Sequence, residues 1–179
     1  MPTGLVYLAM SLDGFIARED GSVDWLNEAS ANAEGEDLGI EAFWSSIDVM
    51  VMGRGSFETL MKIDVWPYPF PVVVLSRSMT DGDIPEKLGG KVRLSALAPG
   101  PVMEELAAEG HERVYVDGGQ LVQSFLAEGL VSELTLTIIP VLLGSGLRCF
   151  PALEKDMDLK LLGSKSFASG LVQSTYGVT

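Results

Sequence analysis

Two strand–glycine–helix junctions, 65 residues apart, constrain the fold of this chain more than any other feature. The first ends the apolar run of residues 47–52 at Gly53, and the second ends residues 114–117 at Gly118 and Gly119. The residues after each junction are expected to form a helix. A helix N-terminus presents unpaired N–H groups and a partial positive charge, and glycine lets an anion approach the backbone closely. Two such junctions predict a ligand with two phosphoryl groups, such as a dinucleotide.

The length of 179 residues predicts one domain over residues 1–179, with a sizeable core. No apolar run approaches the roughly 20 residues needed to span a bilayer, so no membrane partner is expected. The N-terminus lacks the basic and apolar segments of a signal peptide. The only cysteine is Cys149, which fits a reducing compartment. We therefore expect a cytoplasmic protein.

The net charge of −13 argues against nucleic acid as a partner. A single histidine, His111, and a single cysteine exclude a His/Cys zinc site, and His111 is expected at the surface because it lies in a polar loop. No metal is expected. A phosphorylated ligand would need basic residues against this acidic background, and Arg54 and Arg77 are best placed because each follows a predicted strand.

The hydrophobic pattern predicts an α/β fold in three layers. Residues 11–27 are expected to form a long irregular segment. Helices are expected on both faces of a mostly parallel central sheet with an antiparallel C-terminal edge, since the fully apolar strand 72–75 suits a sheet that is covered on both sides. Strands are predicted at residues 5–10, 47–52, 72–75, 91–94, 114–117 and 133–139, with a hairpin of 159–168 and 171–178; helices are predicted at residues 37–45, after Gly53, and at 101–108 and 120–128.

An ordered set of motifs resembles the dihydrofolate reductase-like superfamily. The motifs are residues 8–17, 52–54, 75–78, 117–119 and 140–146. Within the superfamily the chain looks most like the reductase domain of the riboflavin-biosynthesis deaminase/reductase, the RibD C-terminal type. No single motif is specific, but their order is, and the resemblance runs from about Leu5 to the last hairpin.

The resemblance implies NADPH as the cofactor. Each group of residues also has an ordinary structural explanation: apolar strand ends are usually buried, glycines serve tight turns, and surface arginines are common. The cofactor residues implied are Ala9 and Ile16 at the nicotinamide carboxamide, Gly53, Arg54, Gly55 and Ser56 at the first helix start, Ser76, Arg77 and Ser78 at the adenosine 2′-phosphate, and Gly118, Gly119, Gln120 and Leu121 at the pyrophosphate.

On the substrate side, the resemblance implies Asp13, Trp25, Leu143 and Gly144. Asp13 is also a candidate catalytic group, with an Asp-Gly turn as its alternative role. Trp25 is either a pocket wall or a core anchor. Folate reductases carry an acid on the first helix that holds the pterin and relays a proton.

Asp37 matches the position of that acid when residues are counted back from Gly53. A small change of register would move the assignment to Glu36 or Glu41, and acids at helix starts are common on surfaces. Asp37 and Asp13 are therefore the candidate catalytic residues, with water as the other proton source.

Three functions remain open from the sequence. The first is an NADPH-dependent reductase of the riboflavin type, acting by direct hydride transfer on 5-amino-6-(5-phosphoribosylamino)uracil, although only Arg18 and Arg148 offer a second phosphate site. A bifunctional enzyme of this type would also carry a deaminase half upstream. The second is a dihydrofolate or pteridine reductase. The third is a dinucleotide-binding protein without turnover. Residues 134–139 are expected to form an apolar edge strand that pairs two copies into a homodimer.

Overall fold

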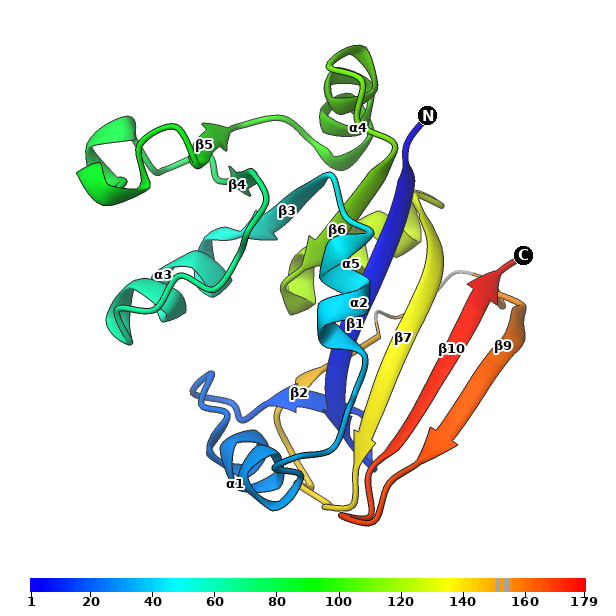
Figure 1. Ribbon diagram of the computed structural model, residues 1–179. Helices are drawn as coiled ribbons and strands as arrows, with labels where there is room; N and C mark the ends of the chain where they lie inside the picture. The colour runs from blue at the N-terminus through cyan, green and yellow to red at the C-terminus, as the bar shows by residue number, and fades with distance from the viewer. Residues whose placement is uncertain (151, 153–154) are drawn as a thin grey trace.

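The computed structural model describes residues 1–150, 152 and 155–179 (Figure 1). Among the described residues, no helix is long and apolar enough to cross a membrane. The strands are β1 (Thr3–Ser11), β2 (Phe15–Ala17), β3 (Val49–Gly53), β4 (Val72–Leu75), β5 (Val92–Ser95), β6 (Arg113–Asp117), β7 (Val131–Ile139), β8 (Leu147–Arg148), β9 (Leu159–Ser166) and β10 (Val172–Val178). The helices are α1 (Asp24–Asn32), α2 (Ile40–Ser45), α3 (Arg54–Lys62), α4 (Pro99–Ala108) and α5 (Gly119–Ala127), with 3-10 turns η1 (Asp81–Asp83) and η2 (Glu86–Leu88).

The described strands build a mixed sheet of eight in the order β5-β4-β3-β6-β1-β7-β10-β9. All neighbours from β5 to β7 run parallel, whereas β10 runs antiparallel to both β7 and β9. Strands β2 and β8 form a separate small ribbon. The expected parallel sheet with an antiparallel C-terminal edge is therefore confirmed.

Alternating side chains of the parallel strands bury both faces of the sheet. On one face, valines of β3 and β6 pack against α4 and α5 through Met103, Leu106 and Phe125. On the other face, Met50 and Met52 of β3 pack with α3, α2 and the segment 66–71. A third cluster joins α1 to the end of β7 and to the β9–β10 turn. The sheet thus forms the middle of three layers.

The chain order creates a crevice at the carboxyl edge of the sheet. From β3 the chain moves outward to β4 and β5, and then returns to place β6 between β3 and β1. Helix α3, which follows β3, packs on one face, whereas α5, which follows β6, packs on the other. In open α/β sheets, ligands bind at such a switch point, outside the carboxyl ends of the strands.

Two helix predictions need correction. Residues 37–45 do not form one helix, because Gly39 has a φ of 80° and α2 begins only at Ile40. The expected irregular segment 11–27 contains β2 and the start of α1. Helix α1 was missed because its first turn lacks a side-chain cap at Val23 and its sequence has only a weak apolar face.

The predicted edge strand is also wrong. Residues 134–139 belong to β7, which lies inside the sheet between β1 and β10. The free edge on this side is β9, all of whose residues are exposed (Figure 1, orange strand). The prediction failed because the pairing of β1 with β7 joins residues that lie far apart in the sequence.

Candidate functional site

The two glycine junctions meet at the switch crevice. Met52 of β3 lies opposite Asp117 of β6, so Gly53 and Gly118 are neighbours. A Cβ atom on Gly118 would lie 2.9 Å from Oγ of Ser56 and 3.5 Å from the backbone nitrogen of Gly53. Gly118 also has a φ of 103°, which L side chains rarely adopt. Two helix N-termini therefore open side by side with little side chain between them, which suits an anion with two phosphoryl groups.

Gly119 and Gly55 flank this place in different ways. A Cβ atom on Gly119 would overlap Cδ1 of Ile16 in β2, so the β2 ribbon rests directly on the start of α5. A Cβ atom on Gly55 would meet no atom of the described residues within 4 Å. The first turn of α3 thus presents bare backbone to open space. Beside it, Leu121 lies close to Gly53, while Gln120 is exposed.

Arg54 and the turn after β4 lie together at the outer end of the crevice. Arg54 Nη1 donates a 2.9 Å hydrogen bond to Ser78 Oγ, and its Nε lies 3.4 Å from Glu58. Ser76 Oγ accepts hydrogen bonds from the backbone nitrogens of Ser78 and Met79, which fixes the turn. Arg77 lies on the same turn and is exposed. The structure therefore brings Arg54 to the Ser76–Ser78 segment, as a 2′-phosphate site requires.

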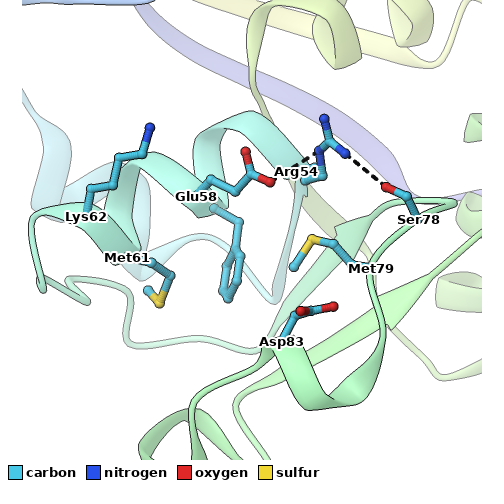
Figure 2. Close-up of a pocket in the computed structure, with 8 residues that line it drawn as sticks. Arg54, Glu58, Met61, Lys62, Ser78, Met79 and Asp83 are labelled. Atoms are coloured by element: carbon cyan, nitrogen blue, oxygen red, sulfur yellow. Dashed lines mark hydrogen bonds and ion pairs between the residues drawn. The ribbon is translucent and has the colours of Figure 1, made fainter.

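A groove of about 530 Å³ runs from this turn along α3. Figure 2 shows Arg54 and Ser78 at one end and Lys62 at the other. The lining includes Phe57 and Met61, which come from α3. The groove therefore combines three apolar side chains with two bases, Arg54 and Lys62, and two acids, Glu58 and Asp83.

A notch opens beside the second half of β1. The pairing of β1 with β6 ends at Leu5 opposite Tyr115, whereas the pairing with β7 continues to Ser11 opposite Ile139. Beyond Tyr7, the strand has no neighbour on the β6 side among the described residues. The hydroxyl of Tyr115 closes the top of the notch, 3.1 Å from the carbonyl oxygen of Tyr7. Ala9 lies on the open stretch, so its backbone is placed where a carboxamide could reach it.

Asp13 holds two loops together. Its Oδ1 accepts hydrogen bonds from Ser11 Oγ at 2.6 Å and from the nitrogen of Leu143 at 3.1 Å, and its Oδ2 accepts one from the nitrogen of Gly144 at 2.7 Å. The Ser11 hydroxyl, with the Gly144 and Leu143 amides, lowers the pKa of Asp13 to about 2. Asp13 is thus an ionised acceptor at neutral pH, which suits fixing the 143–144 turn better than giving a proton.

Trp25 is a buried residue of α1 beside a cavity. It is 4% exposed and packs with Ile139 and Leu171. Its Nε1, like those of Trp44 and Trp66, has no hydrogen-bond partner among the described residues. The cavity has a volume of about 220 Å³ and is also lined by Glu28, Asn32 and Pro140. Trp25 therefore acts as a core anchor and also forms a cavity wall.

Of the three acids considered for proton transfer, Glu36 contacts the lining of this cavity through Ser169. Asp37 is exposed on the loop before α2, where its Oδ1 accepts a 2.8 Å hydrogen bond from the nitrogen of Gly39. Glu36 instead binds the β9–β10 turn through the backbone nitrogen of Ser169 at 3.0 Å. Glu41 is exposed on α2. None of the three is buried, and the hydroxyl of Ser169 lowers the pKa of Glu36.

The family profile of the RibD C-terminal domain matches residues 2–173. The chain belongs to the RibD C-terminal domain family. This RibD C-terminal domain is 34% identical over 170 residues to the uncharacterized protein YwjB of Bacillus subtilis (strain 168), a match that covers 93% of each chain. It is 28% identical to the uncharacterized protein YyaP of the same strain, covering 94% of this chain and 91% of YyaP.

Solved structures show the same fold over the whole domain. A Shewanella sp. PV-4 protein, whose name places it in riboflavin biosynthesis, is 35% identical with a TM-score of 0.91, and 99% of each chain is covered. The deaminase/5-amino-6-(5-phosphoribosylamino)uracil reductase of Thermotoga maritima is 14% identical with a TM-score of 0.75. This RibD C-terminal domain covers 57% of the Thermotoga chain. The resemblance inferred from the sequence motifs is thus confirmed.

Sequence reasoning missed one acid of this RibD C-terminal domain. Asp117 ends β6 directly before Gly118 and is partly buried, with the hydroxyl of Tyr115 3.4 Å from its Oδ1. Burial raises the pKa of Asp117, while hydrogen bonds from Ser56 and Gly118 oppose the rise. The signal in the sequence was an acid at the end of an otherwise apolar strand, next to two glycines. A carboxyl with a raised pKa in a cleft is a functional-site candidate.

Proposed function

We propose that this RibD C-terminal domain is an NADPH-dependent reductase that transfers a hydride directly to a carbon of a heterocyclic substrate. The observation that carries the proposal is the meeting of the two glycine junctions, with Gly118 against Ser56 and Gly53. Because the chain belongs to the RibD C-terminal domain family, a reductase activity is favoured for this site. Arg54 and Ser78, joined at the outer end, support the phosphorylated cofactor NADPH over NADH.

The proposed dinucleotide would lie along the crevice, from the Ser76–Ser78 turn to the notch beside Ala9. Gly53 and Gly118 would hold the pyrophosphate between the starts of α3 and α5, and the bare backbone at Gly55 leaves room for it. The Ser76–Ser78 turn with Arg54 would take the 2′-phosphate. The notch beside Ala9 would receive the nicotinamide, which supplies the hydride when bound. The protein then contributes orientation and exclusion of water.

A proton would come from Asp117 or from water. Asp117 lies at the end of β6, at the mouth of the notch, and burial raises its pKa, which a general acid requires at neutral pH. Asp37 was expected in this role, but it lies on an exposed loop. The pteridine-reductase alternative depended on Asp37 facing the nicotinamide and is correspondingly weaker. A ribosylaminouracil, the substrate named for the Thermotoga relative, is the class that the family likeness suggests.

We further propose that two copies form a homodimer through β9. This strand is a free edge of the sheet and exposes Leu159, Leu161 and Leu162, with Leu161 56% exposed. A free apolar edge strand is a template for pairing. Sedimentation should find a dimer at micromolar concentration, and Leu161→Lys should shift it to a monomer. A monomeric wild type would overturn this assembly.

The deciding experiment is a titration of the protein with NADPH and NADH, followed by calorimetry. We expect tight NADPH binding and weak NADH binding, since the guanidinium of Arg54 is placed for a 2′-phosphate. Consumption of NADPH with a pyrimidine substrate would then demonstrate turnover. Binding without turnover on any pyrimidine or pteridine would favour a dinucleotide-binding protein, and no binding of either cofactor would overturn the proposed function.

A further inference from the structure

Asp117 places a carboxyl group where the two glycine junctions meet. It is the last residue of β6, lies opposite Met52 of β3 and directly precedes Gly118. Ser56 faces this carboxyl from the first turn of α3, and its Oγ lies 2.9 Å from the Cβ position of residue 118. The carboxyl therefore lies beside the starts of both α3 and α5, where the pyrophosphate of the cofactor is proposed to bind.

A carboxylate at this place and a bound phosphate depend on the same donors. The hydroxyl of Ser56, the amide of Gly118 and the hydroxyl of Tyr115 all favour the charged form of Asp117. Backbone amides and hydroxyls at a helix start are also the donors that bind a phosphate. Asp117 thus serves as an internal anion, and a phosphate that takes over these donors leaves the carboxylate with fewer partners.

The titratable groups around Asp117 are tyrosines. Tyr115 lies on β6 itself, with its hydroxyl 3.4 Å from Oδ1 of Asp117. Tyr68 faces it from the segment 66–71, and Tyr7 of β1 lies behind Tyr115, whose hydroxyl contacts the carbonyl oxygen of Tyr7. Burial raises the pKa of all three phenols, so they stay neutral at pH 7 and supply no charge.

No base of the surrounding elements pairs with Asp117 among the described residues. Strand β3 and helix α5 contain only uncharged side chains. The charged residues at the start of α3 are Arg54 and Glu58, which pair with each other, and Arg54 also donates to Ser78 (Figure 2). A phosphate at the junctions would therefore face a carboxylate without a counter-charge in a partly buried site, where like charges repel strongly.

We propose that NADPH binding at the paired glycine junctions is coupled to the uptake of one proton from solvent by Asp117. The inference rests on the proposed reductase function and adds a pH control to the same site. Burial already raises the pKa of Asp117, and a phosphate beside it raises that pKa further. Asp117 then enters the reaction protonated, as a proton donor must be.

The direction of the pH dependence follows from the proton count. When the pH lies between the pKa of Asp117 in the free protein and its higher pKa in the complex, binding draws a proton from solvent. In that range the affinity for NADPH falls by up to about tenfold for each unit by which the pH rises. Below both pKa values Asp117 is protonated in both states, and its effect on the affinity ends.

The test measures NADPH binding by calorimetry from pH 5 to pH 8, in two buffers of different ionisation enthalpy, which gives the affinity and the number of protons taken up. The 2′-phosphate titrates by itself at about pH 6, so the wild type is compared with Asp117→Asn, which cannot take up this proton. We expect the wild type to take up up to one proton more than the variant. Asp117→Asn should bind NADPH about tenfold more tightly at pH 8, and the difference should narrow as the pH falls.

A control variant and a second ligand complete the test. Asp158→Asn removes an exposed carboxylate before β9 and should match the wild type in affinity and proton uptake. NADH lacks the 2′-phosphate, so its binding to the wild type should also take up a proton, and this measurement needs no variant.

Three results would overturn the inference while leaving the cofactor site in place. They are equal proton uptake by the wild type and Asp117→Asn, a difference in affinity between them that does not change with pH, and NADH binding without proton uptake. Failure of the wild type to bind NADPH at any pH would overturn the proposed function together with the inference.

Discussion

Ile16 fills the space directly over Gly119, so that its Cδ1 atom lies where a Cβ atom on residue 119 would be. Ile16 comes from the β2 ribbon, and Gly119 is the first residue of α5. The contact joins the loop that follows β1 to the helix that opens at the pyrophosphate site. A methyl group at position 119 would therefore make the end of the Ile16 side chain shift, whereas the φ of Gly119 itself is ordinary.

Gly119→Ala should weaken NADPH binding, because the added methyl group forces the end of the Ile16 side chain to move toward the cofactor crevice. A smaller partner should restore the fit, so the double variant Gly119→Ala with Ile16→Ala should bind better than Gly119→Ala alone. Calorimetry measures both. Gly163→Ala, in the exposed strand β9 with open space at the Cβ position, serves as the control and should bind as the wild type does. Purely additive losses would show that Ile16 and Gly119 act independently.

Gly55→Ala should change the stability of the fold and the affinity for NADPH in opposite directions. Residue 55 lies in the first turn of α3 and has room for a methyl group, so alanine should stabilise the fold by up to about 1 kcal/mol. The same methyl group should weaken NADPH binding if the phosphate lies against this backbone. Thermal unfolding and an NADPH titration measure the two effects. A stabilised variant with unchanged NADPH affinity would place the phosphate elsewhere.

Removing Arg77 or Arg54 should reduce discrimination between the two cofactors. Arg77→Ala should weaken NADPH by about tenfold to a hundredfold while leaving NADH nearly unchanged, because a hydrogen bond to a charged group contributes roughly 1.5–3 kcal/mol. Arg54→Ala should do the same and also release Ser78. Lys160→Ala, in β9, controls for net charge. Equal losses for NADPH and NADH would instead assign the arginine to the pyrophosphate or to the fold.

Asp117→Asn should lower the rate of substrate reduction while leaving the protein at least as stable at neutral pH. Burial raises the native pKa of Asp117 above its unfolded value, so the native state holds a proton more tightly there. Its contribution to stability is present below the unfolded pKa and is lost as the pH rises through the native pKa. The free energy of unfolding of the asparagine variant should therefore increase relative to that of the wild type as the pH rises from 4 to 7. Denaturant unfolding at several pH values measures this difference. A difference in unfolding free energy between the two proteins that does not change from pH 4 to 7 would contradict the raised pKa of Asp117.

Asp13→Asn should loosen the turn at residues 143–144. The native pKa of about 2 lies below the ordinary value of 3.8, so this carboxylate stabilises the fold above the ordinary value and the effect is lost as the pH falls through the native one. An amide offers one acceptor oxygen in place of two, and the amides of Leu143 and Gly144 should exchange faster with deuterium. Asp158→Asn, on an exposed position beyond this turn, is the matched control. Unchanged deuterium exchange of these two amides would show that the contact between residue 13 and the 143–144 turn does not depend on the charge of Asp13.

The strands were predictable because local pattern determines them. Residues 72–75 are wholly apolar and form β4 with the predicted bounds, and the glycine junctions mark the starts of α3 and α5. The register of β3 and β6 also brings Gly53 and Gly118 together, as the expected dinucleotide site needs, and the cofactor roles of these residues stay predictions. In these cases short-range sequence and fold agree.

The rest depended on contacts between distant residues. Asp37 was placed on a helix because the residues before β3 were read as one run, whereas Gly39 takes a positive φ and α2 starts later. Asp117 was predicted only as the end of a strand, and the sequence could not show that burial beside Tyr115 raises the pKa of its carboxyl. Arg54 meets Ser78 across 24 residues of chain, and no periodicity reports such a pairing. The sequence pattern also could not reveal that β7 lies inside the sheet.

Strand β1 has two neighbouring strands at its start and one at its end, so its backbone amides should differ in how well they are protected from exchange with solvent. Residues 4 and 5 have partners on both sides, whereas residues 6–11 are paired with β7 alone. Successive amides of a strand alternate between its two neighbours, so every second amide in the later stretch should exchange quickly with solvent deuterium while those between remain slow. One strand is thus a rigid support at its start, while the backbone around Ala9 has no strand partner on the β6 side among the described residues. A bound planar amide would convert the fast amides to slow ones, which gives a residue-by-residue record of where it lies.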